Sequence, residues 1–150
     1  MDDCEKLMAE YPQYIYLWKR DMPRGLSGLC IQNVILINTQ KSHAKQHETL
    51  GEEIGHQITT YGDIVSDPTP LNRRCEMWAR RWGYQKTITL DGLIDCWHDG
   101  VNCVYEAAEF FDVTENYVLT VLDYYRESRG EWFTYDGYQF DLSHGINITE

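Results

Sequence analysis

The stretch "LGEEIGHQITT", which begins at Leu50, constrains the fold more than any other part of the sequence. At 100° per residue, Leu50, Ile54 and Ile58 fall on one face of a helix, where they would pack against a core. The surrounding residues continue this period in both directions. The pattern therefore predicts an amphipathic helix over residues 42–60, with Ser42 as its N-cap.

A second stripe of this predicted helix carries groups that can bind a metal. Glu52 and His56 are four residues apart and could grip one divalent ion, and Glu53 could then reach a water molecule on that ion. These are the mechanics of the H-E-x-x-H motif, but the first histidine is a glutamate here. A carboxylate binds zinc too, and its extra negative charge makes manganese or iron an alternative. The ordinary alternative is a solvated acidic face, although Gly51 and Gly55, costly by up to about 1 kcal/mol each in a helix, indicate a close approach to this surface.

Two upstream histidines, His43 and His47, are also four residues apart and could chelate an ion. His47 lies nine residues before His56, which places it about half a turn out of phase on the helix. One ion cannot easily bind both, and the frame "HETLG" ends in glycine where H-E-x-x-H requires a histidine. We therefore expect neither upstream histidine to belong to the metal site.

A third ligand should come from outside this helix, and Glu76 is the natural candidate. It lies in the next predicted helix, over residues 72–87, and the small side chain of Ala79 leaves room beside it. Asp63 and Asp67, in the segment between the two helices, are alternatives. Four arginines near Glu76 are expected mainly to neutralise acids and, less readily, to grip an acidic substrate segment: Arg73, Arg74, Arg80 and Arg81.

The remaining patterns predict a single α+β domain over residues 1–150. A turn signal, Asp136-Gly137, lies between alternating aromatic residues and predicts a closing hairpin. The expected elements are a helix over 2–10, a strand over 14–18, one bent strand or two short strands over 29–38, helices over about 90–98, 103–110 and 114–128, and the hairpin over 131–143.

Composition and charge restrict the class of function. The net charge is −11, so we expect no direct binding of nucleic acid. No apolar run approaches the roughly 18–20 residues that span a bilayer, and the opening "MDDCEKLMAE" lacks the features of a secretory signal, so neither a membrane span nor secretion is expected. The five cysteines form no CxxC pair, which favours free thiols in a reducing compartment, the cytosol.

Residues 101–128 have the spacing of a helix-turn-helix, with Asp112 in place of the usual turn glycine. From Val101 to Gly130 there are six acidic and two basic residues, which gives this segment a net charge of −4. Phosphates would repel a recognition helix of this charge. We interpret the segment as a packed helical pair that could dock a partner.

The stretch "LGEEIGHQITTYGDIVSDPTPLNRRCEMWARRWGYQKTI" resembles the ImmA/IrrE family of metallopeptidases in the short form encoded by phages and mobile elements. The most specific pieces are "EEIGH", the following "GDI" and the pattern E-x-x-A-R-R-W. The similarity extends to the upstream "GLCIQNVILIN", the downstream "AAEFFDVTENYV" and the closing hairpin, so it covers most of the chain. It implies a zincin-like fold, in which a small sheet packs on the metal helix and a helical bundle follows.

The resemblance also implies roles for individual residues. His56 matches the second motif histidine, a zinc ligand; Glu53 matches the general base; and Glu76 matches the third ligand. Glu52 stands where the fuller motif has its first histidine. The family's biology implies an endopeptidase that cleaves a helix-turn-helix repressor, and the departure at Glu52 leaves a second hypothesis, a non-catalytic scaffold that binds a regulator as an antirepressor does.

Overall fold

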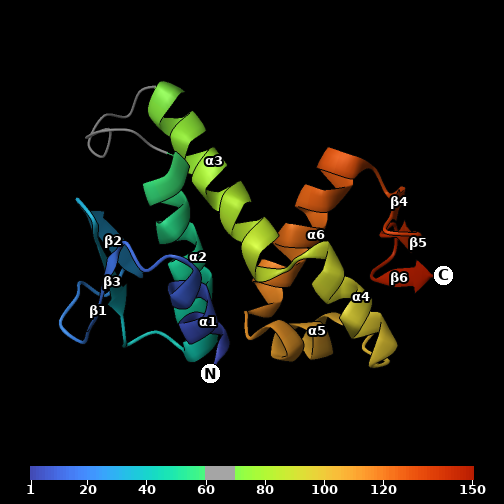
Figure 1. Ribbon diagram of the computed structural model, residues 1–150, viewed down its shortest axis with the longest axis horizontal. Helices are drawn as coiled ribbons and strands as arrows, with labels where there is room; N and C mark the ends of the chain where they lie inside the picture. The colour runs from blue at the N-terminus through green and yellow to red at the C-terminus, as the bar shows by residue number, and fades with distance from the viewer. Residues whose placement is uncertain (60–69) are drawn as a thin grey trace. The chain divides into compact units, whose positions relative to one another are not determined.

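The computed structural model describes residues 1–59 and 70–150, which form two compact units, Met1–Lys86 and Thr87–Glu150 (Figure 1). The predicted α+β class is confirmed. The prediction of a single domain over the whole chain stays a prediction. In chain order the described elements are α1 (Asp3–Glu10), β1 (Ile15–Lys19), β2 (Gly28–Ile31), β3 (Val34–Asn38), α2 (His43–Thr59), α3 (Pro70–Thr87), α4 (Leu90–His98), α5 (Val104–Phe111), α6 (Glu115–Arg129), β4 (Trp132–Tyr135), β5 (Tyr138–Asp141) and β6 (Asn147–Thr149).

The first unit is built around a three-stranded sheet that packs on α2 (Figure 1). The strand order is β1-β3-β2; β1 is parallel to β3, and β2 is antiparallel to it. Ile35 and Ile37 of β3 and Leu50 and Ile54 of α2 are fully buried in one cluster. This cluster confirms the apolar face predicted for the helix, and Ile58 packs at its edge.

The segment 29–38 forms two short strands rather than one bent strand, and β2 begins one residue before it, at Gly28. Gln32 has a positive φ of 53°, so the chain reverses between the strands in a tight turn. The reversal leaves β2 at one edge of the sheet, with β3 as its only neighbour among the described strands. This edge lies beside α2.

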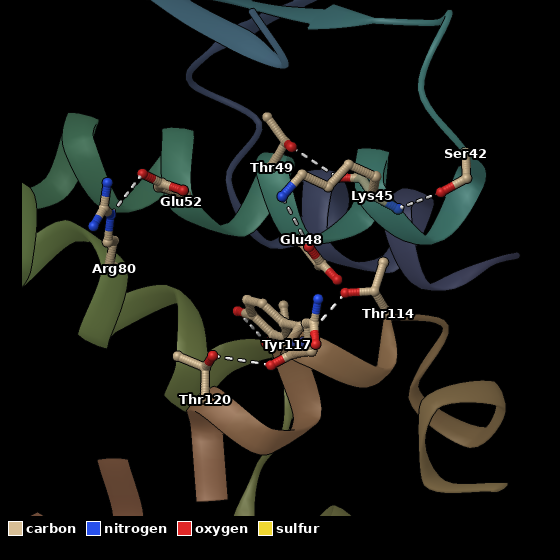
Figure 2. A network of polar contacts seen from close by, with 11 residues as sticks. Ser42, Lys45, Glu48, Thr49, Glu52, Arg80, Thr114, Tyr117 and Thr120 are labelled. Carbon is tan, nitrogen blue, oxygen red and sulfur yellow. Dashed lines mark hydrogen bonds and ion pairs between the residues drawn. The ribbon is translucent and has the colours of Figure 1, made fainter. Parts of the chain in front are cut away.

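The start of α2 follows the prediction. The Ser42 hydroxyl accepts a hydrogen bond from the Lys45 backbone N–H at 3.2 Å, as an N-cap does (Figure 2). Thr49, one turn further on, donates its hydroxyl to the Lys45 carbonyl at 2.7 Å. The helix is thus capped at its N-terminus, about three turns before Glu52.

The second unit contains α4, α5 and α6 and a separate antiparallel sheet of order β4-β5-β6. Asp112 adopts a left-handed conformation (φ 54°, ψ 55°) between α5 and α6, the position at which glycine is usual in a helix-turn-helix. The predicted hairpin turns at Asp136 and Gly137, both with positive φ. The third strand, β6, was not predicted; its Ile148 pairs with Phe140 of β5, and both are buried.

None of the described helices combines the length and the apolar character that a membrane crossing requires.

Candidate metal centre

Small residues let α2 and α3 approach each other closely. A Cβ atom added at Gly55 would overlap the backbone carbonyl of Ala79, and one added at Gly83 would lie 3.1 Å from the Gly51 carbonyl carbon. The two helices therefore meet backbone to backbone at both points. The expectation that Gly55 marks a close approach is confirmed, and the approaching group is α3.

This crossing brings Glu76 of α3 to the polar stripe of α2. His56 Nε2 lies 3.5 Å from Glu76 Oε2 and 3.9 Å from Glu52 Oε1, and one donor atom from each of the three residues lies within 4.8 Å of the other two. Two ligand atoms of one tetrahedral zinc ion are about 3.4 Å apart, because each bond is about 2.0–2.2 Å long. One imidazole and two carboxylates at these separations fit a zinc ion after small side-chain adjustments.

The group is partly open to solvent. His56 is the most shielded member, with 19% of its side chain exposed, whereas Glu52 and Glu76 expose 36% and 47%. A closed structural zinc site has four protein ligands, but a catalytic site has three and keeps one position open. Among the residues that the structure describes, three donors with an exposed side match the catalytic type.

Glu53 lies beside this group but is directed into the unit. Its carboxylate Oε2 accepts a hydrogen bond from the Cys30 thiol of β2 at 2.9 Å. Burial raises the pKa of Glu53; the hydrogen bond from Cys30 and the charge of His56 lower this pKa, while Glu52 and Glu76 raise it. A carboxyl group whose pKa is raised towards neutrality is better suited to accept and release a proton.

Glu52 has a cationic neighbour on the opposite helix. Arg80 Nε donates to Glu52 Oε1 at 3.3 Å, and the two side chains face each other across α2 and α3 (Figure 2). Both are partly exposed, so the pair adds little to stability. Its effect on the site is electrostatic, because it offsets part of the charge that two carboxylates bring. The expectation that the arginines of α3 neutralise acids is thus confirmed for Arg80.

The upstream histidines lie outside this group. His43 is exposed, with Nε2 3.6 Å from a carboxylate oxygen of Asp2, and His47 is buried. The alternative third ligands, Asp63 and Asp67, lie outside the described residues. The structure therefore brings together the three ligand candidates named from the sequence, Glu52, His56 and Glu76.

Two residues beside the candidate site were missed by reading the sequence. Gly28 and Cys30 are two residues apart on β2, so both face α2; the Cys30 thiol contacts Glu53, and a Cβ added at Gly28 would lie 3.1 Å from Glu53 Cγ. The period of two in "GLCI" was a signal that they share a face. Nothing in the sequence showed that this face would meet the glutamate.

The chain was also compared with known proteins. The model of the Peptidase_M78 family, described as the IrrE N-terminal-like domain, matches residues 6–122, which is most of the chain. The chain belongs to this family. A search of curated proteins returns no significant match.

Membership in the M78 family gives the cluster a context. The family consists of zinc-dependent peptidases, and the matched residues include all four candidates from Glu52 to Glu76 as well as β2. The resemblance inferred from "EEIGH" is thereby confirmed at the level of the family. The roles of the individual residues stay predictions.

Proposed function

We propose that this M78 family member is a metal-dependent endopeptidase with a zincin-like core. Glu52, His56 and Glu76 hold one divalent ion, with zinc as the first choice and manganese as the second. The observation that carries the proposal is the group of three donor atoms within 4.8 Å of one another, next to a partly buried glutamate. When bound, the metal supplies Lewis acidity towards the scissile carbonyl and lowers the pKa of water.

Glu53 is the general base of this mechanism. Its raised pKa and its position beside the donor group suit it to take a proton from the attacking water. The same carboxyl group then delivers that proton to the amine that leaves, so Glu53 is restored at the end of the cycle. Burial keeps bulk water from competing for the proton.

The edge strand β2 provides a place for the substrate. An extended peptide can add to the free edge of a sheet through main-chain hydrogen bonds. Because Cys30 of β2 contacts Glu53, a peptide paired along this strand would pass beside the base. A sheet edge recognises backbone rather than a small molecule, which supports a protein substrate.

The substrate we propose is a helix-turn-helix repressor of a phage or mobile element, cleaved in the host cytosol. The support is the resemblance to the short ImmA/IrrE form. The acidic charge of the chain agrees with a protein partner rather than direct contact with nucleic acid.

A second function is favoured by one observation, the replacement of the first motif histidine by Glu52. A site with two carboxylates is a weaker Lewis acid than one with two histidines. The same scaffold could therefore capture a repressor without cutting it, as an antirepressor does.

The variant Glu53→Gln separates the two functions. The zinc-loaded wild type and Glu53→Gln are incubated with a purified candidate helix-turn-helix repressor, and fragments are identified by mass spectrometry. We expect wild-type cleavage, a loss of about 10²–10⁴-fold in Glu53→Gln, and unchanged zinc affinity. Equal cleavage by both proteins would refute Glu53 as the base. Binding without cleavage by either would establish the scaffold function.

A further inference from the structure

Strand β2 contacts Glu53, the proposed base, whose side chain projects from α2. The Cys30 thiol lies 2.9 Å from Glu53 Oε2 and 3.2 Å from the Glu53 backbone carbonyl. A thiol has one proton, and the carboxylate oxygen is both the closer and the more negative acceptor. The hydrogen bond therefore links the edge strand to one chosen oxygen of the Glu53 side chain.

The Cys30 thiol has an environment that favours its protonated, donating form. Burial raises the pKa of Cys30, and the nearby Glu53 carboxylate raises it further. Cys30 therefore keeps its proton at neutral pH. A thiol that stays protonated beside a carboxylate at neutral pH is suited to orienting that carboxylate rather than to acting as a nucleophile.

Gly28, two residues earlier on the same face of β2, restricts Glu53 further. A Cβ atom at Gly28 would lie 2.5 Å from Thr49 Cγ2 and 3.1 Å from Glu53 Cγ. The stem of Glu53 therefore lies close to β2 at Gly28, where no side chain separates strand from helix. A free glutamate side chain has three rotatable torsions, and here the stem is packed while one carboxylate oxygen is bonded.

We propose that Cys30 is a positioning residue for the general base. Its thiol holds Glu53 Oε2, so that Oε1 is left to accept the proton from water. This rests on the proposed function for its catalytic consequence, but the orientation of the carboxylate is a property of the metal-free protein as well. Loss of the bond releases the carboxylate to other rotamers, and a small misplacement of a catalytic group lowers the rate steeply.

Cys30→Ala removes the donor, and Cys30→Ser keeps it in a smaller side chain. Cys103→Ala is the matched control, because Cys103 is an exposed free cysteine in the second unit. We expect Cys30→Ala to lower kcat for repressor cleavage by about tenfold, with KM and zinc affinity unchanged. Cys30→Ser should recover most of kcat, and Cys103→Ala should match the wild type. Equal losses in the alanine and serine variants, or no loss in Cys30→Ala, would overturn the positioning role.

A spectroscopic measurement decides the inference even if the protein cleaves nothing. The infrared S–H stretching band of Cys30 is isolated in metal-free protein by subtracting the Cys30→Ala spectrum. We expect a band shifted to low frequency by the carboxylate, and a return to higher frequency in Glu53→Gln, whose amide oxygen is a weaker acceptor. A band that does not move between these two proteins means that the thiol does not hold the carboxylate, and the inference fails. A shifted band in a protein that binds no zinc would instead refute the proposed function alone.

Discussion

Glu52 is the residue at which this site departs from the two-histidine pattern. It keeps the spacing of four residues to His56, and its side chain places an oxygen 3.9 Å from the imidazole nitrogen. Arg80, on the facing helix, offsets part of the added negative charge. The replacement therefore preserves the geometry of a ligand and changes mainly the electrostatics of the site.

We predict that zinc affinity falls by more than about 100-fold in Glu52→Ala and in His56→Ala, because each removes a donor of the group. Glu52→His should keep most of the affinity, since imidazole restores the usual ligand at the same spacing. His43→Ala is the control, an exposed histidine of the same helix that lies outside the group. Calorimetry on chelator-stripped proteins measures all four variants. Loss of zinc binding in His43→Ala would contradict this assignment, and so would unchanged zinc binding in His56→Ala.

Helical periodicity was enough to predict two of the donors, whereas others depended on information that one helix does not contain. The spacing of Glu52 and His56 follows from the period of the helix. Glu76 was the natural candidate for the third donor because it lies in the next predicted helix, but the sequence alone left Asp63 and Asp67 as alternatives. Cys30 was missed because the distance from a strand to a helix depends on tertiary packing, which a local pattern does not report.

At the scale of elements, the site depends on how closely α2 and α3 cross. Gly55 packs against the carbonyl of Ala79, and Gly83 packs against the backbone of Gly51. Glycine costs up to about 1 kcal/mol relative to alanine within a helix, so its presence at these points opposes local helix propensity. Tertiary packing compensates for this loss of helix propensity, because the close crossing brings Glu76 to the donors of α2.

We predict that Gly55→Ala destabilises the protein by about 1–3 kcal/mol and weakens zinc binding. The gain in helix propensity is smaller than the cost of forcing a methyl group into the Ala79 carbonyl, which pushes the helices apart. Thermal unfolding followed by circular dichroism and zinc calorimetry measure the two effects. Gly25→Ala is the matched control, because a Cβ there meets no described atom within 4 Å. A Gly55→Ala protein as stable as the wild type would show that the crossing tolerates more separation than we infer.

Elements whose apolar residues repeat with a clear period were predicted well. Elements that form only because they pair with another strand were not. Gly51, Gly55 and the apolar face of α2 were recognised in the sequence, and the structure has the close helix crossing and the buried face that they predicted. The strand β6 is only Asn147–Thr149, too short to show alternation, and it exists because it pairs with β5. The choice between one bent strand and two over 29–38 was settled by the turn at Gln32, a residue with no marked turn preference.

At the scale of the whole molecule, the family match covers a much longer part of the chain than the candidate site does. The match spans residues 6–122 and includes parts of both compact units. The three proposed ligands and the base all lie in the first unit, between Glu52 and Glu76. They are divided between α2 and α3, whose connecting segment lies outside the described residues. A metal ion at this site would therefore join two helices that are otherwise held by their close crossing.

We predict that zinc raises the melting temperature of the protein by about 5–10 °C when the zinc concentration is 100 times the dissociation constant. Binding to the folded state alone contributes about 2.7 kcal/mol under that condition, and about 1 kcal/mol shifts the melting of a protein of this size by about 2–4 °C. Hydrogen exchange should show the added protection in α2 and α3, and excess chelator should reverse it. His56→Ala keeps both helices but lacks the best-shielded donor, so its melting temperature should not respond. An equal response in that variant would place the bound zinc elsewhere. No response in the wild type would mean that the crossing of α2 and α3 is an inherited arrangement without a metal, which is the outcome expected of a pure binding scaffold.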